Sequence, residues 1–89
     1  MTEHEKYGKI VLVDLKQRHL EAFLTSTKDV DKELPLQIYY GKVLKAAIDA
    51  GWIIEPVIED VGDVKPARVR WLAEQVITAY SESVTVDPN

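Results

Sequence analysis

The segment from Gly51 to Trp71, GWIIEPVIEDVGDVKPARVRW, contains both tryptophans of the chain, two of its four glycines and two of its four prolines. Gly51 follows an apolar helical pattern, at the position where a left-handed residue commonly ends a helix. Pro66 suits the first turn of a following helix, because its missing N–H would have no helical partner there. We therefore predict an ordered crossover between two helices, not a free linker or an acidic ligand site. The side chains expected to pack against the helices are Trp52, Ile53 and Val57.

A helix is predicted on each side of this crossover. Between residues 35 and 50, apolar side chains recur every three or four positions, and Pro35 suits the first turn. After the crossover, Asp63 or Lys65 is expected to precede the next helix, whose apolar stripe is the clearest in the chain. The stripe consists of Val69, Leu72, Ala73, Val76, Ile77 and Tyr80.

The N-terminal part predicts a short strand and a third helix. Residues 7–15, YGKIVLVDL, contain the apolar and β-branched run that is typical of a strand, which needs another strand or another chain as partner. Asp14 and Gln17 have a capping-box-like spacing, which predicts a helix over residues 15–26. The remaining segments are expected to be a frayed start (1–6), a polar connector (25–34) and an extended tail or short strand (84–89).

Length and composition limit the fold and the classes of function. The 89 residues predict a single domain, 1–89, that is mainly α within the α+β class: three helices and a short N-terminal β-strand or hairpin. The net charge of −4 disfavours binding to nucleic acids and to anionic membranes. The aliphatic run Ile10–Val13 is too short for a signal peptide or a membrane span. We therefore expect a cytoplasmic protein.

The sequence contains no recognisable catalytic or metal-binding motif. None of its serines lies in a nucleophile-elbow motif, and neither His4 nor His19 has a recognisable catalytic partner in the sequence. The stretch 29–33, DVDKE, begins like a calcium loop, but Leu34 and Tyr40 occupy the positions that require glycine and glutamate. The chain has no cysteine, which excludes disulfides and thiolate metal sites. We expect no enzyme activity, no metal and no cofactor.

Aromatic residues are the candidate binding residues. Tyr39 and Tyr40 are adjacent, so both cannot point into one core, and surface aromatics are favoured at protein interfaces. Trp71 flanks the apolar stripe of the last helix and could equally be a core-edge or an interface residue, whereas for Trp52 the core-edge interpretation is favoured over binding. Gly41, inside the second helix, either permits close packing by another helix or is simply tolerated. The candidate protein-interaction residues are Tyr39, Tyr40, Trp52, Trp71 and Tyr80.

Six short phrases resemble a small protein from the tail-assembly gene region of long-tailed bacteriophages and prophages, described as a tail assembly chaperone or tail component. They are Leu20–Phe23, Ala46–Ile48, Ala50–Trp52, Lys65–Ala67, Trp71–Ala73 and Asp87–Asn89. The resemblance implies a helical protein without enzyme activity or cofactor, which binds the tape-measure and tail-tube proteins in a bacterial or infected cell. Residues 7–15 lie outside it. Two alternatives stay open: a generic helical interaction module, including a homodimer, and a structural or connector component of the tail.

Overall fold

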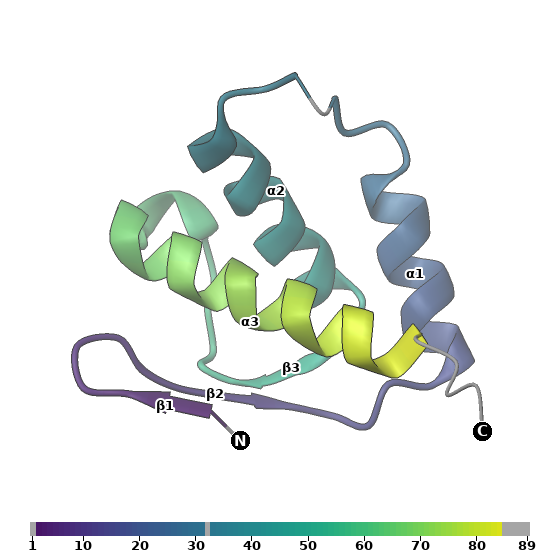
Figure 1. Cartoon of the computed structure of the whole chain (residues 1–89), viewed down its shortest axis with the longest axis horizontal. Coiled ribbons are helices and arrows are strands. Elements are labelled where there is room, and N and C mark those ends of the chain that lie inside the picture. The colour runs from purple at the N-terminus through teal and green to yellow at the C-terminus, as the bar shows by residue number, and fades with distance from the viewer. Residues whose placement is uncertain (1, 32, 85–89) are drawn as a thin grey trace.

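The computed structural model describes residues 2–31 and 33–84. Its elements are three helices, a three-stranded sheet and one turn of 3-10 helix, which confirms the predicted α+β fold class. In chain order they are β1 (Thr2–His4), β2 (Gly8–Leu12), α1 (Gln17–Thr27), α2 (Leu36–Asp49), β3 (Ile53–Glu55), η1 (Val61–Asp63) and α3 (Pro66–Val84). Figure 1 shows α2 and α3 crossing each other, with α1 beside α2 near the C-terminal end of α3 and the sheet along one edge of the helices. The expected tail at 84–89 lies outside the described residues, except for Val84, which ends α3.

The sheet is antiparallel, with β2 between β1 and β3. The expectation that residues 1–6 are frayed is wrong for β1, in which His4 pairs opposite Gly8 and Glu3 opposite Lys9. The reversal is possible because Gly8 has a φ of 84°, a left-handed conformation that glycine adopts without steric cost. The predicted strand, β2, therefore has a partner strand from its own chain on each side, β1 and β3.

The start of α1 differs from the prediction at Asp14. The helix begins after Lys16, whose backbone N–H donates to Nδ1 of His19 at 3.1 Å. This bond is one half of a capping box, with histidine in the position usually taken by glutamate or glutamine. Asp14 is not the N-cap because it lies two residues before Lys16, in a segment that still follows the crossover: the N–H of Val13 donates to the carbonyl of Trp52 at 2.9 Å.

The end of α2 confirms the predicted role of Gly51. The Gly51 N–H donates to the Ile48 carbonyl at 3.0 Å, and the Trp52 N–H donates to the Ala47 carbonyl at 3.1 Å. These two bonds form a Schellman motif, and Gly51 adopts the left-handed conformation that it requires, with a φ of 74°. The motif reverses the chain so that Trp52 returns against its own helix.

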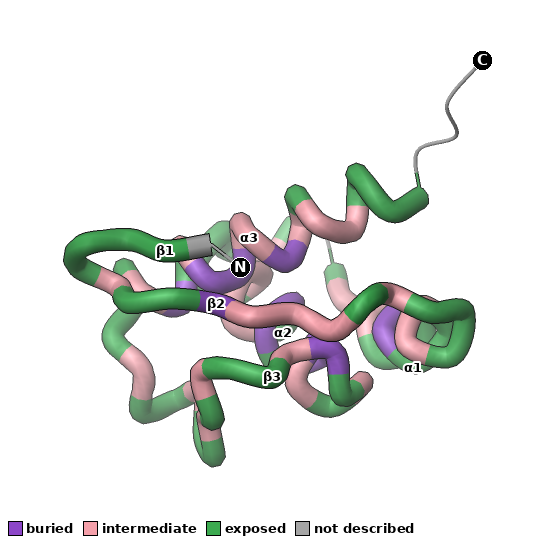
Figure 2. Tube along the Cα trace, turned by 90° about the horizontal axis from the view of Figure 1, so that it is seen from below, coloured by how far each residue is buried: buried purple, intermediate pink, exposed green. Residues whose placement is uncertain are grey.

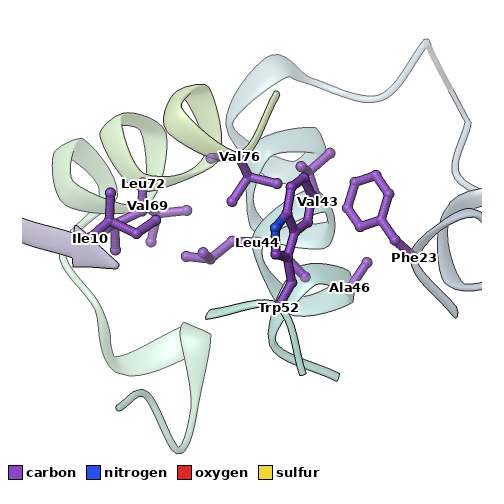
Figure 3. Close-up of a cluster of buried hydrophobic side chains, with 11 residues drawn as sticks. Ile10, Phe23, Val43, Leu44, Ala46, Trp52, Val69, Leu72 and Val76 are labelled. Atoms are coloured by element: carbon purple, nitrogen blue, oxygen red, sulfur yellow. The ribbon is translucent and has the colours of Figure 1, made fainter. Parts of the chain in front are cut away.

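The core lies between α2 and α3 and is closed by one residue each from β2 and α1. Figure 3 shows Ile10 near the α3 side chains Val69 and Leu72, and Phe23 near the indole of Trp52. Figure 2 shows that β2 and β3 are otherwise half-buried or exposed. The buried residues are Ile10, Phe23, Val43, Leu44, Ala46, Ala47, Trp52, Val69, Leu72, Ala73 and Val76.

The crossover packs with a different set of side chains from the predicted one. Trp52 is buried and Ile53 is half-buried against the core, as expected. Val57 is 86% exposed, so its predicted packing is wrong. It lies beyond the end of β3, and the next residue, Ile58, packs against the core in its place. No helix in the described part of the chain combines the length and apolar character that crossing a bilayer requires.

Candidate protein-interaction site

Trp52 is a core residue, which contradicts its prediction as an interaction residue. Only 1% of it is exposed, and its ring meets Phe23 edge-on with the ring centroids 5.6 Å apart. The Schellman motif at Gly51 directs this side chain inward, so a partner could reach it only if the domain opened. The packing interpretation that the sequence left open is therefore the correct one for Trp52.

Tyr39 and Tyr80 are brought together at an apolar groove, here called the α1–α3 groove. It has a volume of about 430 Å³ and receives side chains from all three helices. Its floor contains Phe23, whose ring lies 5.8 Å from that of Tyr80 and connects α1 to α3. The lining residues are Phe23, Leu24, Thr27, Val30, Tyr39, Val43, Ile77, Tyr80 and Ser81.

The lining of the α1–α3 groove is apolar apart from a few hydroxyl groups, and none of its residues is charged. Leu24 is 43% exposed there, although an apolar side chain is stabilised by leaving water. The Thr27 hydroxyl is already engaged, since it donates to the Phe23 carbonyl at 3.0 Å. The arrangement therefore suits apolar side chains of a partner better than a charged ligand.

Tyr40 and Trp71 are half-buried and take part in contacts within the chain. The Arg70 guanidinium lies 5.9 Å from the centre of the Tyr40 ring, within reach of a cation–π interaction. Arg70 Nε also donates to Glu74 Oε1 at 2.8 Å, and this hydrogen bond and the carboxylate charge raise the pKa of Arg70. This surface is therefore more polar than the α1–α3 groove.

Trp71 holds the N-terminal hairpin against α3. The rings of His4 and Tyr7 stack with centroids 4.5 Å apart, and both lie near the Trp71 ring, at 5.7 and 6.1 Å. Arg68 Nε donates to the Tyr7 carbonyl at 3.3 Å, which adds a second connection. This contact with the hairpin gives Trp71 a packing role within the chain, which nothing in the sequence around His4 or Tyr7 indicated.

The titratable groups singled out in the sequence take part in local structure. His4 Nδ1 accepts from the Lys6 N–H at 3.0 Å, and His19 Nδ1 accepts from the Lys16 N–H. Asp31 of the calcium-loop-like stretch accepts from the Glu33 N–H at 2.8 Å, a short turn within the connector. In the described residues, no group of three or more histidines and carboxylates is placed to hold a metal ion.

Leu24 and Ile77 are among the residues of the α1–α3 groove that were not candidates, although the sequence contained a signal for both. Leu24 follows Phe23 on the apolar side of α1, and Ile77 belongs to the apolar stripe of α3. Neither was singled out for binding, because periodicity identifies an apolar face without showing where its partner helix ends.

The chain has no significant match to a protein-family model, a curated protein or a solved structure. The resemblance to tail assembly proteins therefore stays a prediction.

Proposed function

We propose that this protein is a non-enzymatic assembly chaperone that holds an apolar segment of a phage tape-measure or tail-tube protein during tail morphogenesis. It would act in the cytoplasm of a bacterial or infected cell. The observation that supports this function best is the α1–α3 groove, which is apolar, accessible and built on a small acidic domain. The six phrases that resemble tail assembly proteins supply the identity of the partner.

The groove suits the apolar face of an amphipathic helix or a short extended segment. Such a ligand inserts a few side chains into a groove and leaves its polar face in water. Leu24, Tyr39 and Tyr80 would provide an aliphatic contact and two aromatic contacts with polar ends, a combination enriched at protein interfaces. The net charge of −4 keeps the free chaperone soluble and attracts segments whose apolar residues are flanked by lysine or arginine.

Co-expression tests the partner. The tape-measure and tail-tube proteins of the same tail gene region are each produced with the tagged full chain, and the retained protein is identified after affinity purification. We expect at least one of them to be retained in a complex of fixed stoichiometry. If neither is retained, the proposed function is wrong.

A matched pair of variants tests the groove. Leu24→Glu places a charge in the α1–α3 groove, whereas Leu36→Glu places the same charge on α2, where Leu36 is 57% exposed and outside this groove. We expect Leu24→Glu to lose the tail protein and Leu36→Glu to retain it, while both keep a cooperative thermal unfolding transition. Equal retention by the two variants would assign the binding to another surface.

A further inference from the structure

A second groove runs along α2 on a face that the α1–α3 groove does not use. It lies between α2 and the crossover residues 58–62, has a volume of about 380 Å³ and shares no lining residue with the first groove. Its apolar lining comes from Ile38 and Ile48 of α2 and from Ile58 and Val61 of the crossover. Ile38 is 49% exposed, so the apolar surface continues outward to the rim. We call it the α2–crossover groove.

Gly41 lies in this groove and is not required by the packing of the chain itself. A Cβ built on Gly41 meets no atom within 4 Å, so a larger residue would fit in the isolated chain. Glycine is less favourable than alanine inside a helix, but it lets another backbone approach closely. Of the two interpretations that the sequence left open for Gly41, the accessible groove favours close packing by another chain.

The two walls of the α2–crossover groove carry opposite charges. Lys42 and Lys45 stand on the α2 wall, and Glu59 and Asp60 stand on the crossover wall. Lys45 pairs with Asp49 at 3.4 Å, whereas Lys42 and Glu59 form no ion pair with any residue that the structure describes. One surface therefore offers an apolar centre between Lys42 on one side and Glu59 on the other, and neither charge is paired within the described part of the chain.

We infer that the α2–crossover groove binds a second copy of this chain. A two-fold axis places the α2 wall of one copy against the crossover wall of the other, so each opposite-charge pair forms twice. A partner of uniform charge would match only one wall, whereas an identical copy matches both. This inference does not rest on the proposed chaperone function, because it needs no tail protein.

The expected dimer is weak. The domain exposes 6286 Å² in total, and an interface of about one-tenth of that surface per copy lies at the small end of specific complexes. We therefore expect dissociation in the micromolar range, which a monomer–dimer fit to sedimentation equilibrium of the full chain at several concentrations can measure. A chain that stays monomeric at every concentration up to the millimolar range overturns the inference.

Charge reversal tests which surface forms the dimer. In Lys42→Glu or Glu59→Lys alone, both copies of the Lys42–Glu59 contact become repulsive, and we expect dissociation constants about tenfold higher. The double variant Lys42→Glu/Glu59→Lys keeps the net charge and restores both contacts, so its dissociation constant should return to near the wild-type value. Equimolar Lys42→Glu and Glu59→Lys should form a heterodimer in preference to either homodimer.

Two controls separate this surface from general charge effects. Lys16→Glu, at the exposed N-cap of α1, and Glu21→Lys, at an exposed position within it, make the same charge changes and should shift the dissociation constant much less. Gly41→Gln fills the groove without adding charge, so it should abolish the dimer without lowering the thermal midpoint of the monomer. A dimer that responds equally to the α1 and groove variants, or that tolerates Gly41→Gln, uses another surface and overturns the inference.

Discussion

At the residue scale, two glycines only ten positions apart do opposite things to stability. Gly51 has a φ of 74° at the end of α2, a conformation that costs a side-chain-bearing residue about 1–2 kcal/mol. Gly41 is inside the helix with open space at its Cβ position, so alanine there should gain about 0.5–1 kcal/mol. We therefore expect Gly51→Ala to lower the free energy of unfolding and Gly41→Ala to raise it. Urea denaturation at a concentration where the chain is monomeric measures both, and changes of the same sign would contradict the prediction.

The two tryptophans differ in how deeply they are buried, and so in how much stability their truncation should cost. Trp52 is 1% exposed at the centre of the core, and truncating such a residue to alanine costs about 3–5 kcal/mol. A domain this small is expected to have only about 5 kcal/mol of stability, so the cost is close to the whole of it and Trp52→Ala should be largely unfolded at room temperature. Trp71→Ala removes a half-buried contact with the hairpin and should leave a cooperative transition. Circular dichroism through a urea titration distinguishes the two variants, and a folded Trp52→Ala would show that the core tolerates this cavity.

At the scale of the element, the helices around the crossover could be predicted because their signals are local. Pro35 and Pro66 mark the starts of α2 and α3, and Gly51 marks the end of α2, each within one turn of the boundary. The hairpin was left open as an alternative to a single strand, but its first strand, β1, was expected to be frayed because it is polar and short. The support of the hairpin comes from Trp71, which is distant in sequence. A contact with a distant residue does not produce the alternation of apolar and polar residues by which a strand is predicted from sequence.

The candidate site was predictable in part for a related reason. Tyr39 and Tyr80 were identified because large amphipathic side chains gather at interfaces, and the structure places both at the α1–α3 groove. Trp52 satisfied the same compositional rule, yet the Schellman motif turns it into the core. Composition identifies aromatic residues capable of binding, whereas backbone reversal and helix crossing decide which of them remain accessible.

The start of α1 gives a prediction about a single element. Because His19 Nδ1 accepts the Lys16 N–H at 3.1 Å, His19→Ala leaves that donor without its partner and should lower the free energy of unfolding by about 0.5–1 kcal/mol. His19→Gln retains an acceptor in the position that capping boxes favour and should lose much less. Thermal unfolding of both variants measures the difference. Equal losses would mean that His19 stabilises α1 through packing and not through this hydrogen bond.

At the scale of the whole molecule, α1 is the most weakly attached of the three α-helices. Phe23 is its one buried residue, while α2 and α3 contribute four each. Phe23 also meets both Trp52 and Tyr80, so the same side chain attaches α1 and forms the floor of the α1–α3 groove. The shape of the proposed binding site therefore depends on whether α1 stays docked, and α1 should be the first helix to open.

Phe23→Ala tests this dependence. Truncation of a buried phenylalanine costs about 3–5 kcal/mol, and we expect most of that loss to appear as undocking of α1. Amide hydrogen exchange should then show α1 losing protection by about two orders of magnitude or more, with a smaller loss in the parts of α2 and α3 that contact each other. Leu24→Ala, one residue along the same helix and 43% exposed in the wild type, is the matched control and should keep α1 protected. If Phe23→Ala lowers protection equally in all three helices, the domain opens as one unit, and the groove cannot form or disappear independently of the fold.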